Sequence, residues 1–95
     1  MIGTYYPGET MRLMARDLEH VDEGIVTADA TVTVTVLNPD GTTYAEETAQ
    51  TDGIGNDWYV DLAAPATVGV YAVQIVATKG AATAKDRNAI RVKAF

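Results

Sequence analysis

Apolar and polar side chains alternate along several short segments of the chain, and the alternation is clearest in residues 30–37, which read ATVTVTVL. Val32, Val34 and Val36 fall on one side of an extended backbone, and threonines fall on the other. β-branched side chains fit such a backbone and lose rotamer freedom in a helix. The segment is therefore predicted to be a strand with one buried face. Its register is fixed because a shift of one residue would expose all three valines.

Four further segments show the same period of two: residues 10–16, 58–62, 70–78 and 89–95. Residues 25–27 can form one more short strand within an acidic, irregular segment. No stretch has the 3.6-residue period of an amphipathic helix of useful length. The side chains predicted to face inward are Met11, Leu13, Ala15, Trp58, Val60, Leu62, Tyr71, Val73, Ile75, Ala77, Ile90 and Val92.

Turn-forming residues separate these segments. Asn-Pro-Asp-Gly at 38–41 combines a proline that fixes one φ with a glycine that can take a positive φ. The glycine-containing segments 51–57 and 78–82 are predicted to be hairpin loops, and Pro7-Gly8 is predicted to form a turn before the first long strand.

Strands that are apolar on one face need a second sheet to cover that face. Their number and spacing predict an all-β fold, an immunoglobulin-like antiparallel β-sandwich of six or seven strands. The length of 95 residues suits one domain, and we expect residues 1–95 to form it.

The net charge of −6 is distributed unevenly along the chain. Residues 1–61 carry 12 acidic and 2 basic side chains, a balance of −10, and residues 62–95 carry 1 acidic and 5 basic side chains, a balance of +4. This asymmetry can guide docking between two molecules, or the basic residues can pair with acidic neighbours inside one fold. Nucleic acid is not an expected partner, because its phosphates require a basic face.

The chain contains no cysteine, so neither disulfides nor thiolate-bound metals are expected to stabilise it. The first residues, MIGTYYPGET, lack the basic and apolar regions of a secretory signal. No apolar run approaches the roughly 18 residues of a membrane helix. We therefore expect a protein that is made in the cytoplasm and does not contact a membrane.

Acidic side chains in the first long loop are weak candidates for calcium ligands, since calcium prefers oxygen donors. They lack the EF-hand spacing, so the alternative is an ordinary solvated loop. Asp52, Asn56 and Asp57 offer oxygen atoms too, but their spacing suits a glycine-rich turn better. The candidates in the first loop are Asp17, Glu19, Asp22 and Glu23.

His20 is the only histidine in the sequence. A zinc site needs several nitrogen or sulfur ligands, and a catalytic histidine needs a nucleophile and an orienting partner. We therefore expect an exposed loop histidine, no catalytic residue, no cofactor and no enzymatic activity.

The aromatic residues divide into two groups. Trp58 and Tyr71 could stack against a sugar, but both lie on the inward phase and are predicted to anchor the core. Tyr71 follows Gly69-Val70, an arrangement similar to the tyrosine corner of β-sandwiches, in which the hydroxyl group bonds to nearby backbone. The candidates for contact with a partner protein are Tyr5, Tyr6, Tyr59, Arg91, Lys93 and Phe95.

The order of several segments resembles that of bacterial and phage immunoglobulin-like domains. These segments read YYPGETMRL, VTVTVLNPDGT, TDGIGNDWYVDL and VGVYAVQIVAT, and together they span nearly the whole chain. The outline is similar to macroglobulin-type and invasin-like modules, and it most resembles small immunoglobulin-like virion structural proteins of tailed bacteriophages. The shared motifs are turn glycines, a core tryptophan and a core tyrosine.

This resemblance implies a non-enzymatic structural protein located in the virion, for example a capsid or tail decoration protein or a neck protein. Its partners would be other protein subunits, including further copies of the same chain. No catalytic residue is implied. The alternative is a binding module cut from a bacterial surface protein, which would contact carbohydrate or a host protein.

Overall fold

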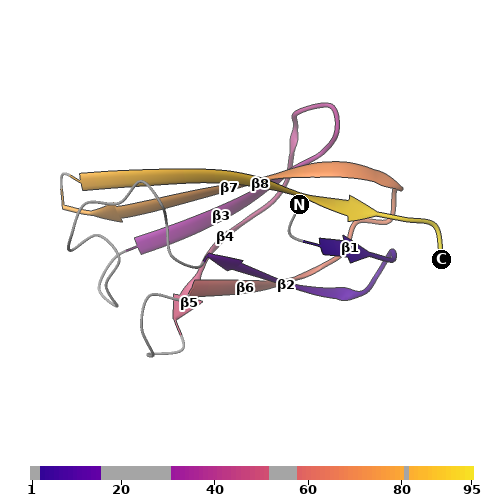
Figure 1. Cartoon of the computed structure of the whole chain (residues 1–95), viewed down its shortest axis with the longest axis horizontal. Helices are drawn as coiled ribbons and strands as arrows, with labels where there is room; N and C mark the ends of the chain where they lie inside the picture. Colours follow the sequence, from indigo (N-terminus) through magenta and orange to yellow (C-terminus); the bar gives the residue numbers. More distant parts are fainter. Residues whose placement is uncertain (1–2, 16–30, 52–57, 81) are drawn as a thin grey trace.

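A computed structural model describes residues 3–15, 31–51, 58–80 and 82–95 of the chain. These residues form strands and no helix, which confirms the predicted all-β fold (Figure 1). In the described residues there is accordingly no helix with the length and hydropathy needed to cross a membrane. The strands are β1 (Gly3–Tyr5), β2 (Thr10–Ala15), β3 (Thr31–Leu37), β4 (Thr43–Thr48), β5 (Gln50–Thr51), β6 (Trp58–Ala63), β7 (Gly69–Lys79) and β8 (Ala82–Val92).

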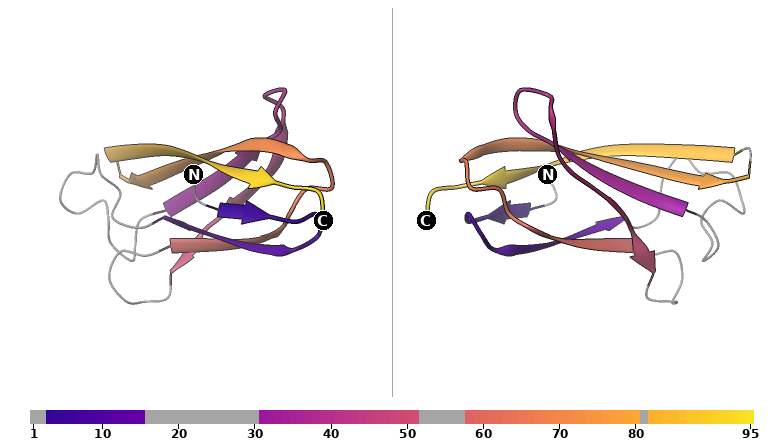
Figure 2. Two further views of the ribbon diagram at one scale, coloured as in Figure 1. Left: turned by 45° about the vertical axis from the view of Figure 1, so that its right-hand side comes forward. Right: turned by 180° about the vertical axis from the view of Figure 1, so that it is seen from behind.

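The strands form two sheets that face one another (Figure 2). The five-stranded sheet has the order β1-β8-β7-β3-β4, and the three-stranded sheet has the order β2-β6-β5. Neighbouring strands are antiparallel except β1, which runs parallel to β8. The chain passes from the first sheet to the second between β4 and β5, where the Ala49 N–H still donates to the Val32 carbonyl oxygen at 2.7 Å.

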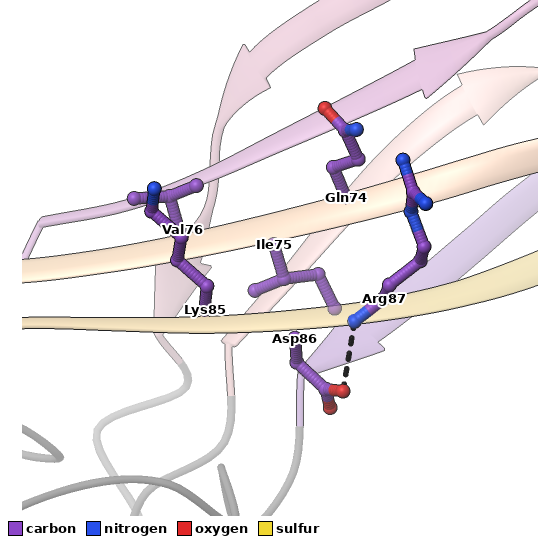
Figure 3. Close-up of a pocket in the computed structure, with 6 residues that line it drawn as sticks. All are labelled: Gln74, Ile75, Val76, Lys85, Asp86 and Arg87. Carbon is purple, nitrogen blue, oxygen red and sulfur yellow. Dashed lines mark hydrogen bonds between the residues drawn. The ribbon is translucent and has the colours of Figure 1, made fainter.

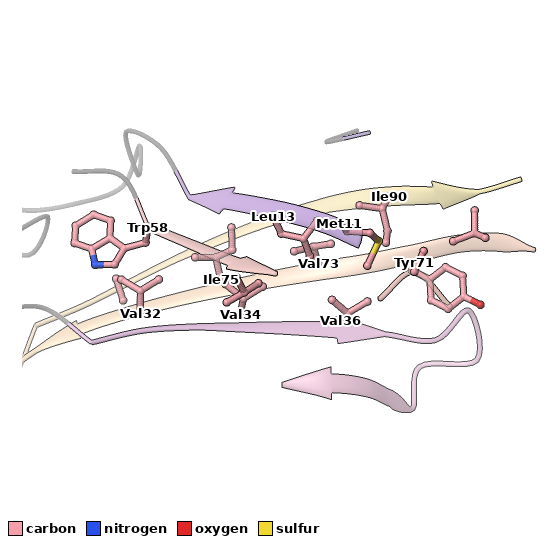
Figure 4. Close-up of a cluster of buried hydrophobic side chains, with 14 residues drawn as sticks. Met11, Leu13, Val32, Val34, Val36, Trp58, Tyr71, Val73, Ile75 and Ile90 are labelled. Atoms are coloured by element: carbon pink, nitrogen blue, oxygen red, sulfur yellow. The ribbon is translucent and has the colours of Figure 1, made fainter. Parts of the chain in front are cut away.

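The core lies between the sheets and takes apolar side chains from both (Figure 4). Almost all of the residues predicted to face inward are buried there, since alternate positions on each strand point to the same face. Leu62 is half-buried and packs against the core, and the side chain of Ala15 lies outside the described residues. The buried hydrophobic residues of the core are Met11, Leu13, Val32, Val34, Val36, Trp58, Val60, Ala64, Tyr71, Val73, Ile75, Ala77, Ile90 and Val92.

The predicted turns at 38–41 and at Pro7-Gly8 are both present. The Gly41 N–H donates to the Asn38 carbonyl oxygen at 2.9 Å, and Gly41 has a φ of +91°. At the other turn the Glu9 N–H donates to the Tyr6 carbonyl oxygen at 3.1 Å. Gly8 in this turn has a φ of +83°, so a side chain at either glycine would be strained, because L-residues rarely adopt a positive φ.

The two predicted hairpins are confirmed by strand pairing. β7 and β8 are antiparallel up to the pair Lys79–Ala82, and Gly80 between them has a φ of +60°. β5 and β6 are antiparallel on either side of residues 52–57. Those loop residues, and the short strand predicted at 25–27, lie outside the described residues.

The described residues contain eight strands, whereas six or seven were expected. Two differences have a clear cause. β4 lies at the edge of its sheet with nearly every side chain exposed, so its sequence, TYAEET, shows no alternation. β8 begins at Ala82, whereas the sequence pattern placed its start at residue 89. The pattern missed the first part of the strand because the polar residues Asp86 and Asn88 occupy the inward phase there and remain exposed.

Tyr71 forms the predicted corner at the start of β7. Its side chain is 1% exposed, and its hydroxyl group donates to the Thr67 carbonyl oxygen at 2.6 Å. This hydrogen bond ties the segment before β7 to the buried end of the strand. A carbonyl group at the rim of the core is thereby satisfied.

Replacing Tyr71 with phenylalanine should lower the free energy of unfolding by about 1 kcal/mol, the usual net contribution of one such hydrogen bond. The Tyr44→Phe variant is the matched control. Its hydroxyl group donates to the Ala63 carbonyl oxygen at 2.8 Å in an exposed position, where water can replace the bond. Urea unfolding of both variants provides the comparison, and equal losses would contradict a special role for Tyr71.

Replacing Trp58 with alanine should cost about 3–5 kcal/mol of unfolding free energy, because the indole ring is buried and its removal leaves a cavity. The side chain is 2% exposed in the structure. Tyr59→Ala, which removes a ring from the opposite face of β6, should cost less. A Trp58→Ala variant that unfolds at the parent's urea concentration would contradict the buried position.

Candidate interaction surface

Exposed apolar side chains gather where β1, β7 and β8 meet. We define the terminal patch as Tyr6, Val68, Val70 and Phe95, which are 43%, 55%, 45% and 102% exposed. The first three line a shallow groove with a volume of about 470 Å³. Its remaining walls come from Gly69, Arg91, Val92, Lys93 and Ala94.

Strand pairing explains why residues from both ends of the chain meet at this patch. β1 lies beside the last residues of β8, so that Thr4 pairs with Arg91. On the other side of β8, Val70 pairs with Arg91 in the antiparallel ladder with β7. The Lys93 N–H donates to the Tyr5 carbonyl oxygen at 2.9 Å and extends the contact beyond the strand.

The ring of Phe95 lies against Tyr6 in an edge-to-face arrangement, with the ring centroids 5.3 Å apart and an interplanar angle of 83°. Tyr6 is itself anchored, because its N–H donates to Glu9 Oε1 at 2.6 Å. Arg91 and Lys93 are exposed beside the rings. The result is an aromatic and aliphatic surface with two cationic side chains at its margin.

Four of the six predicted partner-contact residues therefore lie together: Tyr6, Arg91, Lys93 and Phe95. Tyr5 does not belong to this surface, since it is half-buried and packs against the core. Its neighbour in β1, Thr4, takes the exposed phase instead.

Tyr59 lies on the other sheet, in an exposed cluster with Arg12 and Asp61. These last two residues are directly opposite in the β2–β6 pair. Arg12 Nε donates to Asp61 Oδ1, and Arg12 Nη2 donates to Asp61 Oδ2, both at 2.9 Å. The guanidinium carbon lies 4.3 Å from the Tyr59 ring centroid, within the range of a cation–π contact.

The ion pair changes the acidity of both partners. The hydrogen bond from Arg12 lowers the pKa of Asp61, and the same bond raises the pKa of Arg12. Both side chains are well exposed, at 58% and 41%, so the pair holds two charges in place rather than storing much stability. The Arg12–Asp61 pair is therefore a surface ion pair that is accessible to solvent and to a partner molecule.

The calcium candidates Asp17, Glu19, Asp22 and Glu23, together with His20, lie outside the described residues, as do Asp52, Asn56 and Asp57. Across residues 3–15, 31–51, 58–80 and 82–95 no three carboxylate or histidine side chains are grouped to hold a metal ion. Within the same ranges every buried side-chain nitrogen or oxygen atom has a hydrogen-bond partner.

Sequence reasoning did not single out Val68 and Val70. The sequence did contain a signal for Val70, because this apolar residue occupies the outward phase of β7, where a polar side chain is expected on a solvent-facing sheet. Val68 precedes the strand and therefore has no inward or outward phase.

No protein-family model, curated protein or solved structure matches the chain.

Replacing Arg12 with glutamine should raise the pKa of Asp61 toward its ordinary value of 3.8, because the main cause of its lowered pKa is removed. A lowered folded-state pKa means that the ion pair contributes stability above the unfolded pKa and loses it as the pH falls through the folded pKa. NMR titration of the Asp61 carboxyl carbon measures the change.

Asp40 serves as an internal control in the same titration. Its pKa is lowered by the Thr42 hydroxyl group, which does not depend on Arg12. Its titration should therefore stay unchanged. An Asp61 pKa that is equal in parent and variant would show that the two side chains are not paired in solution.

Proposed function

We propose that this chain is a non-enzymatic structural protein that binds other protein subunits through the terminal patch. The observation that carries the proposal is the patch itself, in which two aromatic rings and two valines lie exposed beside two cations. Exposed apolar patches mark interaction sites, and the centres of protein interfaces are enriched in aromatic residues and arginine. A fitting partner presents an apolar surface with carboxylates at its margin.

The sandwich is, in this proposal, immunoglobulin-like. Three features support this. The strand order of the five-stranded sheet corresponds to A′GFCC′ of immunoglobulin domains, and that of the three-stranded sheet corresponds to BED. The chain changes sheets between β4 and β5. Tyr71 forms a corner at the start of β7, the strand equivalent to F. The tryptophan departs from the antibody pattern, because Trp58 lies on β6 rather than on β3.

The location we propose is the virion of a tailed bacteriophage, where the chain would act as a capsid or tail decoration protein or as a neck protein. This part rests on the resemblance of the strand and turn order to phage immunoglobulin-like proteins. A small module with an exposed apolar patch suits repeated attachment to a lattice of identical subunits. No nucleic acid, membrane or cofactor is part of the proposal.

Mass spectrometry of density-purified virions tests this proposal, and the chain should be present in the particles. A Val70→Ser, Phe95→Ser double variant, supplied as a tagged copy during particle production, should be incorporated at least about tenfold less, since it removes two apolar contacts from the patch.

The control is Val76→Ser, which makes a similar change on the same strand and phase but outside the terminal patch. It should be incorporated like the parent. Absence of the parent chain from virions would refute the virion assignment. Equal incorporation of all variants would refute the role of the patch. Recovery of the chain within a longer surface polypeptide would favour the alternative of a surface binding module.

A further inference from the structure

The five-stranded sheet has two long edges, and they carry opposite charge. One edge is β4, and the other is the first part of β8, residues 82–89. β8 pairs with β7 along its whole length but with β1 only at residues 90–92. Among the described residues, no strand pairs with the outer side of β4 or of residues 82–89.

Backbone N–H groups on this part of β8 point away from the sheet. Lys93 donates its N–H toward β1, on the outer side of β8, and N–H direction alternates along a strand. The odd-numbered residues of β8 therefore direct their N–H groups outward. Two of these groups bond to the preceding side chain: Arg87 N–H to Asp86 Oδ1 at 2.8 Å (Figure 3), and Ala89 N–H to Asn88 Oδ1 at 2.9 Å.

Charged side chains line both edges on the same outer face. Cross-strand pairing places Glu46, Thr35, Gln74 and Arg87 in one row across the sheet. Figure 3 shows Gln74 and Arg87 on the side of the sheet opposite to Asp86. Lys85 shares the phase of Arg87, two residues away. Glu46 accepts a hydrogen bond from the Thr35 hydroxyl group at 3.1 Å, which keeps its carboxylate over this face.

We propose that β4 of one copy pairs with residues 82–89 of β8 in a second copy, so that the five-stranded sheets of successive copies join into one continuous sheet. The strand directions allow this, because β8, β7, β3 and β4 are antiparallel in turn and β4 is therefore antiparallel to β8. A copy shifted sideways along the sheet presents its β4 in the favourable antiparallel direction.

One register satisfies charge, face and hydrogen bonding together. The Ala49 N–H points toward β3, so Glu46 and Thr48 direct their N–H groups outward, as Lys85 does on β8. Placing Glu46 opposite Lys85 puts opposite charges on one face, with Arg87 as a diagonal neighbour. The same register places Thr48 opposite Thr83. Moving the strand by two residues, so that Glu46 faces Arg87, would set Glu47 against Asp86.

Pairing of two β8 edges about a twofold axis is less favourable. The two registers that pair the largest part of residues 82–89 set Lys85 opposite Lys85, or opposite Arg87, of the other copy. Like charges directly opposite destabilise a strand pair. The β4–β8 contact joins two different surfaces, so a pair of copies keeps one unused β4 edge and one unused β8 edge. Repetition then gives an open chain or a ring instead of a closed dimer.

Sedimentation velocity over a range of concentrations tests the proposal with purified protein at about 0.1 M salt, where contact charges still act over roughly 10 Å. The parent should form species larger than dimers, growing with concentration. Glu46→Lys and Lys85→Glu should each weaken association by about tenfold, because each turns an attractive pair into a repulsive one.

An equimolar mixture of the two variants should restore assembly. The lysine introduced on β4 of one variant then faces the glutamate introduced on β8 of the other, and the natural Glu46–Lys85 pair forms at the next contact. Glu47→Lys makes the same charge change at the neighbouring residue, opposite Ala84 and diagonal to Asp86, and should associate at least as strongly as the parent. Circular dichroism confirms that each variant is folded.

The proposal does not depend on the terminal patch, so a Val70→Ser variant should assemble like the parent. Three results would overturn it: a parent that stays monomeric at every concentration, a discrete dimer, or charge variants that assemble as the parent does. Loss of assembly in Val70→Ser with no effect of the edge variants would assign self-association to the patch.

Discussion

The exclusion of polar groups from the space between the two sheets is the constraint on which this structure depends. In the described part of the chain, the 14 buried side chains of the core carry only two N–H or O–H groups: the Trp58 indole N–H and the Tyr71 hydroxyl group, which bonds to backbone. Burial of one such side chain contributes about 1.5–3 kcal/mol, and the chain has no disulfide to add to this. Polar chemistry is therefore confined to outer faces, edges and ends.

This constraint explains how much of the fold could be predicted. Val32, Val34 and Val36 alternate with threonines because only one face of β3 is covered, and the same logic located the inner positions of the other long strands. Gly41 marked its turn because it adopts a positive φ that other residues avoid. Tyr71 could be assigned to its corner because it directly follows Gly69-Val70, an arrangement that can be recognised in the local sequence.

Features without local signals could not be predicted. β4 is exposed on both faces, so its side chains need not alternate, and β1 is a three-residue strand whose parallel partner lies almost the whole chain away. Tyr5 was predicted to contact a partner protein because it has no obvious inward phase in the sequence, yet in the structure it packs against the core. Sequence reasoning selected some residues of the terminal patch, among them Phe95. It did not select Val68, because nothing in the neighbouring sequence indicates that this residue lies beside Tyr6 and Val70.

The side-chain bonds along the outer border of β8 have a consequence for how molecules of this protein meet. The N–H groups of Arg87 and Ala89 already donate to the side chains of Asp86 and Asn88. This part of the edge therefore presents fewer unpaired N–H groups to a strand of another molecule. A strand that pairs as far along β8 as Arg87 or Ala89 must replace these acceptors with its own carbonyl groups. This replacement makes strand pairing at these two residues less favourable, and it therefore opposes nonspecific aggregation along this part of the edge.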